Sequence, residues 1–284
     1  MKSDFKLGRY TLDLSKPQIM GILNVTQDSF SDGGLFVDSD KAKQQAKLMV
    51  EEGASIIDVG GESTRPGAKP ISADEELARV IPVIEYITQL NIPVSIDTNK
   101  ASVMEAAVKA GASMINDVCA LQNPGALEAA SKLQVPICLM HMQGSPQTMQ
   151  DKPHYDDVVV DIIQFFKQRI EACTATGIDA SLLVLDPGFG FGKTLEHNLN
   201  MLSRLQEFNV LNCPLLVGMS RKSMIGQTIN KPADKRVSAS VALAILAWQK
   251  GASLIRVHDV QQTKDALDMV MAVNSSTNSF ESNP

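Results

Sequence analysis

The amino-acid sequence predicts an α/β protein, a single-domain (β/α)8 TIM barrel with an N-terminal β-hairpin that caps the barrel bottom. Short β-branched or aliphatic runs alternate with longer amphipathic segments along most of the chain, which is typical of repeated βα units. Several of these runs are apolar on both faces, as strands are when helices cover them outside and side chains fill the barrel inside. Polar residues follow nearly every run, as they do where the strands of a barrel enzyme end.

Length and composition fit one such domain. The chain has 284 residues, of which 44% are hydrophobic and 20% are charged, and barrels of this kind reach roughly 250 residues as one unit. We therefore expect the barrel to span residues 1–273 and the Ser- and Asn-rich segment 274–284 to be a disordered tail. The net charge of −6 gives no electrostatic basis for binding nucleic acid.

The first elements expected along the chain are a hairpin and then the eight parallel strands. Residues 5–14 indicate a short hairpin that turns at Gly8 and Arg9. The expected strands are 18–25, 55–60, 94–98, 113–118, 137–142, 182–186, 215–219 and 254–257. An open, doubly wound sheet would also explain the alternation, but eight units with polar strand exits favour a closed barrel.

The helices are expected between these strands, and three of them end at the same kind of joint. Gly53, Gly111 and Gly251 each stand in a Gly-Ala-Ser triplet that precedes a strand, where glycine can adopt the left-handed conformation and end the helix. Such a repeated joint indicates a repeated unit. The expected helices are 40–52, 73–88, 100–110, 124–132, 156–176, 196–207, 233–250 and 262–271.

Polar side chains gather at the carboxyl ends of the expected strands, while the opposite ends carry mostly glycine, proline and aliphatic residues. A single Asp at such a position could equally cap the following helix, but eight polar exits together predict an active site at this end. The residues are Asn24, Asp58 with Glu62, Asp97, Asn116 with Asp117, His141, Asp186, Ser220 with Arg221 and Lys222, and Arg256 with His258.

Three connections at this end of the barrel carry further signals. Residues 26–38 and 60–72 are longer than usual linkages and are expected to be mobile lids. The run 188–194 resembles a phosphate loop, but its spacing is one residue too short for that motif. We therefore expect it to supply flexible backbone beside Asp186, with Phe189 and Phe191 either facing a planar ligand or lying in the core.

The residue types at the site suit a polar heterocycle and a phosphate group. Carboxylates and amides pair with ring N–H and amino groups. Arg256 and His258 alternate along the last strand and so face the same way, and with Arg65 from a loop they suit phosphate oxygens. Asn24 offers an oxygen to Mg²⁺, which seldom needs more than one or two protein groups.

Other mechanisms and compartments lack support in the sequence. We find no Ser-His-Asp order, H-E-x-x-H motif or Cys/His cluster, so nucleophilic or zinc hydrolysis is not expected. The four cysteines form no C-x-x-C pair, the N-terminus has no apolar signal, and the longest apolar run is far too short to span a membrane. These features predict a reduced, cytoplasmic protein that does not bind membranes.

The motifs match one family in order across almost the whole chain, and the sequence resembles the bacterial dihydropteroate synthases, which bind pterins. The resemblance rests on Gly21-Ile-Leu-Asn24-Val-Thr, Asp28-Ser-Phe-Ser-Asp-Gly-Gly34, Asp58-Val-Gly-Gly-Glu-Ser-Thr-Arg-Pro-Gly67, Ser95-Ile-Asp-Thr98, Ile115-Asn-Asp117, Asp186-Pro-Gly-Phe-Gly-Phe-Gly-Lys193, Ser220-Arg-Lys-Ser223 and Arg256-Val-His-Asp259.

The resemblance implies a transferase of folate biosynthesis that condenses 6-hydroxymethyl-7,8-dihydropterin pyrophosphate with p-aminobenzoate. It also implies Mg²⁺, held by Asn24, and a homodimer. Asp97, Lys222 and Arg256 are the implied catalytic residues. The implied ligands of the pterin pyrophosphate are Thr64, Asp97, Asn116, Asp186, Lys222, Arg256, Val257 and His258. Those of p-aminobenzoate are Phe30, Thr64, Arg65, Pro66, Phe191, Lys222 and Ser223. Glu62, Asp117 and His141 receive no role.

Two alternatives stay open. A barrel of the same family could transfer a methyl group from methyltetrahydrofolate to a corrinoid protein, using the same pterin-binding acids. The groups that suit pyrophosphate, Arg256 with His258 and the Ser220-Arg-Lys segment, argue for the condensation instead. A barrel without catalytic activity that only binds a partner would be expected to have lost some of these groups.

Overall fold

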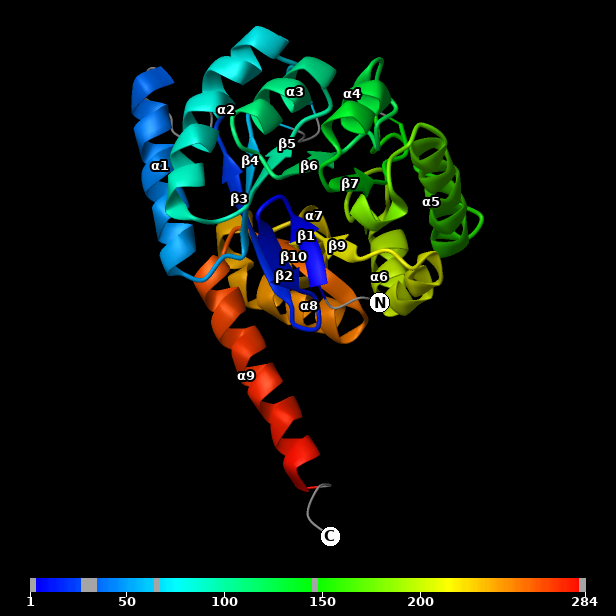
Figure 1. The fold of residues 1–284 in the computed structure, drawn as a ribbon. Helices are drawn as coiled ribbons and strands as arrows, with labels where there is room; N and C mark the ends of the chain where they lie inside the picture. The colour runs from blue at the N-terminus through cyan, green and yellow to red at the C-terminus, as the bar shows by residue number, and fades with distance from the viewer. Residues whose placement is uncertain (1–3, 27–34, 64–66, 145–147, 281–284) are drawn as a thin grey trace.

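The computed structural model of the chain describes residues 4–26, 35–63, 67–144 and 148–280, and of residues 35–38 and 277–280 it describes the helical backbone alone. Eight parallel strands close into a barrel in the order β10-β3-β4-β5-β6-β7-β8-β9. The helices surround the strands, as Figure 1 shows. The closed barrel confirms the predicted fold class and excludes the open sheet.

The strands lie where the sequence predicts them, and most end a residue or two earlier. They are β3 Gln18–Asn24, β4 Ile56–Gly60, β5 Val94–Asp97, β6 Met114–Asp117, β7 Ile137–Met140, β8 Leu183–Asp186, β9 Leu215–Val217 and β10 Ala252–Val257. Gly53, Gly111 and Gly251 all have positive φ angles, of 92°, 114° and 101°. These angles confirm the glycine joint between helix and strand, because residues with a Cβ atom rarely adopt positive φ angles.

Nine α-helices lie in the described parts of the chain. They are α1 Leu35–Glu51, α2 Ala73–Ile87, α3 Ala101–Lys109, α4 Ala126–Leu133, α5 Val158–Ala175, α6 Leu195–Ser203, α7 Ser223–Ile229, α8 Val237–Gln249 and α9 Val260–Phe280. Short 3₁₀ turns at Thr88–Leu90, Ala180–Leu182, Leu205–Leu211 and Ala233–Lys235 complete several of the connections.

The predicted helices differ most from the structure at α1, α7 and α9. Helix α1 begins at Leu35, inside the segment predicted as a long loop. The seven residues of α7 were not predicted as a helix, because so short a segment shows little periodicity and contains Gly226.

Helix α9 continues to Phe280 instead of ending at residue 271. Its last turns are rich in Ser and Asn, which are poor helix formers. Extending a formed helix needs only one further hydrogen bond per residue, and the hydroxyls of Ser275 and Ser276 donate to carbonyls of the preceding turn. Figure 1 shows this end of α9 projecting away from the barrel. The domain boundary at residue 273 stays a prediction.

The hairpin covers the bottom of the barrel, as predicted. Strands β1 (Asp4–Leu7) and β2 (Tyr10–Asp13) pair across a tight turn in which Gly8 has a φ of 59°. The apolar side chains of the hairpin form one cluster with the lowest inward-facing side chains of the barrel strands. The buried members of this cluster are Phe5, Leu7, Leu12, Met20, Ile56, Met114, Cys138, Val184, Leu216 and Leu254. Figure 1 looks onto this end, with β1 and β2 across the barrel.

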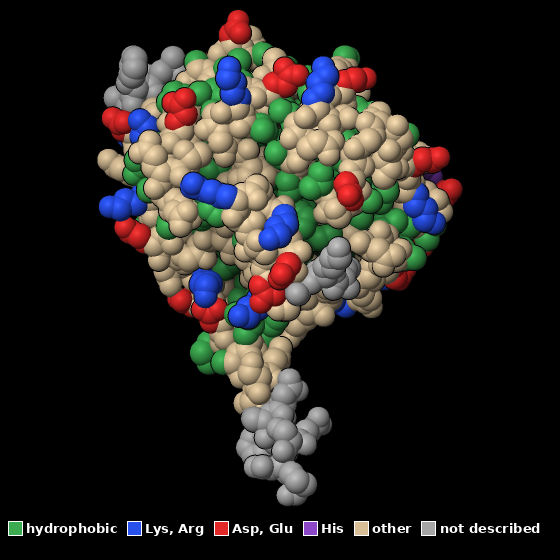
Figure 2. All heavy atoms as spheres, in the orientation of Figure 1, with side chains coloured by type: hydrophobic (Ala, Val, Ile, Leu, Met, Phe, Trp, Pro, Cys, Tyr) green, Lys and Arg blue, Asp and Glu red, His purple; other side chains and the backbone are tan. Residues whose placement is uncertain are grey.

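A second, larger core fills the space between the strands and the surrounding helices. It contains alternate strand residues such as Ile57, Val59, Ile115 and Val257. On the outer surface, Figure 2 shows acidic and basic side chains interspersed over the face that carries the hairpin. Every helix in the described residues is too short or too polar to cross a membrane.

Candidate active site

Strand periodicity decides which of the predicted polar residues enter the barrel. Side chains two residues apart on a strand face the same way, so residues two or four positions after the inner-core residues also point inward. Met20, Ile56, Met114, Val184 and Leu254 belong to that inner core. The polar residues with this spacing are Asn24, Asp58, Asn116, Asp186, Arg256 and His258, and Asp97 joins them because it pairs in register with Asn116.

Four of these side chains form one buried network around Arg256. The Arg256 Nε lies 2.6 Å from Asp58 Oδ2, and its Nη2 lies 2.8 Å from Asp97 Oδ2. The same Asp58 oxygen accepts a hydrogen bond of 3.0 Å from Asn116 Nδ2. Asp58 is fully buried, and its Oδ1 has no partner among the described residues. One arginine therefore balances two carboxylates in the middle of the predicted site.

The network perturbs the acid–base properties of its members. Burial raises the pKa of Asp97 to about 7, against the opposing effect of the Arg256 charge. Burial acts to lower the pKa of Arg256, but Asp58 and Asp97 more than offset it, so the pKa lies above its usual value. Arg256 is therefore charged at any physiological pH, whereas Asp97 is the member of this pair that can change its charge near neutrality.

Lys222 lies on the other side of the mouth, at the position that precedes helix α7. Its Nζ donates to the Phe189 carbonyl and lies 4.4 Å from the centre of the Phe191 ring. Burial lowers the pKa of Lys222 to about 8, while the carboxylate of Asp186 acts to raise it. Burial likewise raises the pKa of Asp186, and Lys222 opposes this. The two groups therefore support each other's charged forms.

The glycine-rich turn after Asp186 is tightly held rather than flexible. Gly188, Gly190 and Gly192 all have positive φ angles. The backbone N–H of Gly188 donates to Asp186 Oδ1 at 2.8 Å, and the N–H of Gly190 donates to Asn198 Oδ1 at 2.7 Å. Phe189 is fully buried in the outer core, whereas Phe191 is half-buried beside Lys222. Of the two phenylalanines, only Phe191 can line a ligand site.

Replacing Gly188 with alanine is expected to destabilise the protein by at least ~2 kcal/mol, because the change combines a strained backbone with a backbone clash. Its φ is 73°, and an added Cβ would lie 2.0 Å from the His141 carbonyl oxygen. Gly177 is a matched control, since its φ is 87° but nothing lies within 4 Å of an added Cβ. Urea unfolding would measure the free energy of unfolding of both variants. An equal decrease in the two would show that the backbone clash at Gly188 is relieved without cost.

The loops after β9 and β10 are joined behind the mouth. His258 Nδ1 lies 3.0 Å from Ser220 Oγ, and the guanidinium of Arg221 forms an ion pair with Asp259. Arg221 has a φ of 59°, and the Arg236 side chain donates to its carbonyl at 2.9 Å. This bonding fixes the backbone that presents Lys222 and His258.

The structure places the other predicted residues outside this network. Val257 faces the outer core, so its side chain does not enter the mouth. Ser223 is exposed at the first turn of α7. Phe30, Thr64, Arg65 and Pro66 lie outside the described residues, which leave out 27–34 in the first predicted lid and 64–66 in the second.

The three residues without a predicted role have structural contacts. Glu62 Oε2 forms an ion pair with Lys100, and Glu62 Oε1 accepts from the Ile71 N–H at 3.2 Å. Asp117 accepts backbone hydrogen bonds of 2.8 Å from Cys119 and Leu121. His141, buried outside the barrel strands, contacts Lys193.

Asp58 is the site residue that the sequence interpretation left unassigned. It was recognised as a polar strand end, but its bonds to Arg256 and Asn116 join positions 198 and 58 residues away. Asp58 lies two residues after Ile56 of the inner core, so the periodicity of a strand predicts that its side chain points into the barrel. Asp58 therefore holds two predicted substrate ligands, Arg256 and Asn116, in place.

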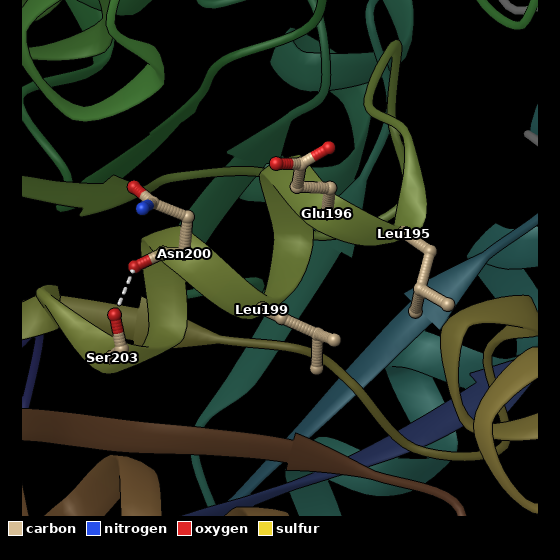
Figure 3. Close-up of a pocket in the computed structure, with 5 residues that line it drawn as sticks. All are labelled: Leu195, Glu196, Leu199, Asn200 and Ser203. Carbon is tan, nitrogen blue, oxygen red and sulfur yellow. Dashed lines mark hydrogen bonds between the residues drawn. The ribbon is translucent and has the colours of Figure 1, made fainter.

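A separate surface hollow with a volume of about 530 Å³ lies along helix α6. Figure 3 shows Leu195 and Leu199 projecting from one side of the helix, with Ser203 bonded to the Asn200 carbonyl at 2.8 Å. None of the residues that line this hollow was predicted to bind a substrate. It lies on α6 outside the barrel strands, so it is separate from the active site.

Asn24 places a side-chain oxygen near the acidic network. Its Oδ1 and Asp97 Oδ2 would each lie 3.7 Å from a Cβ built on Gly60, so both oxygens face the same small space. Among the described residues, no group of three or more His, Cys, Asp or Glu side chains is arranged to hold a metal ion. A site of this kind fits Mg²⁺, which binds through few protein oxygens, better than zinc.

Fold and site together are those of a barrel enzyme whose polar side chains gather at the carboxyl ends of its strands. The sequence matches the family described as pterin binding enzyme over residues 20–258. The chain therefore belongs to the pterin-binding enzyme family, among its dihydropteroate synthases.

The relatives agree over nearly the whole chain. Dihydropteroate synthase of Escherichia coli strain K12 is 54% identical over 266 residues, which cover 93% of this chain and 94% of that one. A Yersinia pestis dihydropteroate synthase crystallised with a sulfonamide drug is 54% identical with a TM-score of 0.92, covering 96% and 99% of the two chains. The Xanthomonas albilineans enzyme in complex with 7,8-dihydropteroate is 46% identical with a TM-score of 0.87, covering 95% and 98%.

Proposed function

We propose that the barrel mouth condenses 6-hydroxymethyl-7,8-dihydropterin pyrophosphate with p-aminobenzoate, giving 7,8-dihydropteroate and pyrophosphate. Family membership defines the reaction, and the observation that best supports it in this chain is the inward-facing set of two carboxylates, an amide and a lysine. Such a set matches the donors and acceptors on the edge of a pterin ring. The related enzyme with bound 7,8-dihydropteroate supports the same assignment of substrate class.

The pterin ring is proposed to bind Asp97, Asn116, Asp186 and Lys222. The carboxylate of Asp186 accepts from ring N–H and amino groups, and the Lys222 ammonium donates to a ring carbonyl or nitrogen. These side chains are largely withdrawn from water, which strengthens each polar contact with the ligand. Because Asn116 is held by Asp58 at 3.0 Å, its amide is oriented before the ligand arrives.

The pyrophosphate is proposed to bind at Arg256 and His258, with Asn24 contributing to a Mg²⁺ site. When bound, the metal would neutralise charge on the leaving pyrophosphate. Arg256 would contribute its planar set of N–H donors, which match phosphate oxygens. Val257 can take part only through its backbone, because its side chain lies in the outer core.

The p-aminobenzoate is proposed to bind between Phe191, Lys222 and Ser223, with Phe30, Thr64, Arg65 and Pro66 contributed by the two predicted lids. Phe191 offers a ring face and Lys222 a charge beside it. The aromatic ring and carboxylate of the substrate match these two groups. This second pocket lies next to the pterin ligands because Lys222 belongs to both.

The proposed mechanism is dissociative. As the bond to pyrophosphate breaks, the pterin methylene gains positive charge, which the electron-rich ring and the nearby Asp97 carboxylate stabilise. An arylamine is largely neutral at pH 7, so it attacks this carbon without a strong base. The proposed catalytic residues are accordingly Asp97, Lys222 and Arg256, which bind and stabilise charge. Closed loops would keep water from the cation.

The direct test is to measure consumption of p-aminobenzoate with the pterin pyrophosphate, with and without Mg²⁺. We expect dihydropteroate and pyrophosphate in equal amounts, and loss of activity when the metal is removed. The alternative methyl transfer would instead need methyltetrahydrofolate and a corrinoid protein. Turnover with that pair and none with p-aminobenzoate would contradict the proposal.

The pH dependence of kcat/KM is expected to report Lys222. The lysine binds as the ammonium, which is lost as the pH rises through its lowered pKa of about 8, so kcat/KM should fall above that pH. Asp186→Asn removes the carboxylate that raises this pKa, so the falling limb should move to lower pH. Asp265→Asn on the exposed face of α9 is the control. If kcat/KM of Asp186→Asn falls at the same pH as in the wild type, another group causes the decrease.

We further propose that the protein acts in the cytoplasm as a homodimer. The four cysteines, Cys119, Cys138, Cys173 and Cys213, are all free, which fits a reducing compartment. Burial raises the pKa of the Cys138 thiol well above its usual value and makes it unreactive. Sedimentation of the purified protein would test the dimer.

A further inference from the structure

One buried lysine near the proposed site belongs to no substrate group. Lys193 ends the glycine-rich turn and is only 3% exposed. Its Nζ lies 2.9 Å from the carbonyl oxygens of Gly188 and Phe191 and 3.0 Å from Nδ1 of His141. The His141 carbonyl oxygen lies 3.4 Å away. The Nζ therefore meets four acceptors, two of which belong to the turn itself.

His141 is the acceptor outside the turn, and its own packing fixes where the Lys193 side chain lies. His141 follows strand β7, and its ring packs against Phe165 of helix α5 at a centroid distance of 4.8 Å. Burial, reinforced by the charge of Lys193, lowers the pKa of His141 to about 2. The ring is therefore neutral over the whole working pH range and can accept a hydrogen bond from Lys193 throughout.

The turn held by Lys193 carries groups that face the mouth. The Phe189 carbonyl accepts from Lys222 Nζ, and the Phe191 ring lies against the same nitrogen. At Gly190, an added Cβ would lie 3.3 Å from Lys222 Cδ. A shift of this backbone would therefore move the Phe191 ring and the Phe189 carbonyl, whereas the backbone of Lys222 lies outside the turn, before α7.

We propose that Lys193, fixed by His141, is a positioning residue for the p-aminobenzoate half of the site. This inference rests on the proposed function, because it assigns Phe191 and Lys222 to that substrate. Lys193 touches neither substrate; it holds the carbonyls of Gly188 and Phe191 at a fixed separation, so that the Phe191 ring faces the second substrate. A displacement of about 1 Å at a substrate-positioning group can cost on the order of 10²-fold in rate.

The pterin half should depend less on Lys193. Asp186 lies on strand β8, where pairing with β7 in register Met140 to Asp186 fixes its backbone. Asp97 and Asn116 lie on other strands. Phe191 has no strand partner, and the turn that carries it is held by hydrogen bonds from side chains.

The test is Lys193→Met, which keeps the apolar stem and removes the Nζ donors. We expect KM for p-aminobenzoate to rise at least ~10-fold while KM for the pterin pyrophosphate changes less than ~3-fold. Amide hydrogen exchange across residues 188–192 should become faster without any substrate present. Tyr155→Phe is the matched control, because it removes only one 2.8 Å bond to Gly192 of the same turn.

The outcomes separate this inference from the proposed function. Equal rises in both KM values, unchanged KM values, or unchanged amide exchange would each overturn the positioning role. A wild-type protein that makes no dihydropteroate would contradict the proposed function, whereas amide exchange would still decide whether Lys193 holds the turn. If Lys193→Met does not fold, Lys193→Gln retains one donor group, and we expect the same order of KM changes at smaller size.

Discussion

Replacing Lys222 with alanine is expected to lower kcat/KM for dihydropteroate formation by at least ~10²-fold, while the fold stays intact. The reason is that one side chain serves both proposed substrates. Its Nζ donates to the Phe189 carbonyl and lies 4.4 Å from the Phe191 ring centre. Its charge also opposes the burial that raises the pKa of Asp186. Alanine would remove a donor to the pterin and leave Asp186 more readily protonated.

Initial rates of pyrophosphate release would measure this effect, with circular dichroism and thermal unfolding to confirm the fold. Lys47→Ala is the control. Lys47 is exposed on α1, and its Nζ forms a long surface ion pair of 3.9 Å with Glu51 Oε1. We expect it to keep the wild-type rate, because surface ion pairs contribute roughly 0–1 kcal/mol. A Lys222→Ala variant with a near-normal rate would refute the role of Lys222 in both halves of the site.

The barrel itself could be predicted from the sequence because its signals are local. Runs such as Ile56–Gly60 are apolar on both faces, and each is followed by a helix with its own turn residues. The same periodicity of two puts Asn24, Asp97 and Asn116 inside the barrel. A short helix such as α7 gives no comparable pattern, because seven residues make only two turns.

The interactions between site residues could not be predicted in the same way, since they join distant parts of the chain. Asp58 and Arg256 are 198 residues apart, and His141 and Lys193 are 52 residues apart. The turn at 188–192 was expected to be flexible because it is rich in glycine. Glycine is instead needed there for positive φ and close backbone packing, and the side chains of Lys193 and Asn198 then hold it.

The network around Arg256 changes what its removal should do. In the sequence interpretation Arg256 was a ligand of pyrophosphate, grouped with His258. In the structure its guanidinium lies between Asp58 and Asp97, at 2.6 and 2.8 Å. Pyrophosphate would therefore bind the guanidinium N–H groups that these two bonds leave, or displace one of the carboxylates. Asp97 is the more accessible of the two, whereas Asp58 is fully buried, so we expect Asp58 to keep its bond.

Arg256→Ala is therefore expected to weaken binding of the pterin pyrophosphate at least ~10²-fold, and binding of a pterin without phosphate much less. The smaller loss of affinity for the pterin without phosphate has a separate cause. Removing the arginine leaves the buried carboxylates of Asp58 and Asp97 without their counterion, which costs roughly 3–5 kcal/mol unless they take up protons. Since Arg256 is the charge that lowers the pKa of Asp97, that pKa should rise further above its usual value. Residual binding that depends on ionised Asp97 should accordingly improve with increasing pH.

Calorimetric titration with each ligand at two pH values would separate the two effects. Arg256→Lys keeps the positive charge but loses the planar set of donors, so it should restore the charge balance at Asp97 more fully than the binding of pyrophosphate. Arg9→Ala at the barrel bottom, where Arg9 bonds Tyr10 and the Thr88 carbonyl, serves as the control. Equal losses for both ligands in Arg256→Ala would mean that Arg256 acts as the counterion of Asp58 and Asp97 alone, and that the pyrophosphate binds elsewhere.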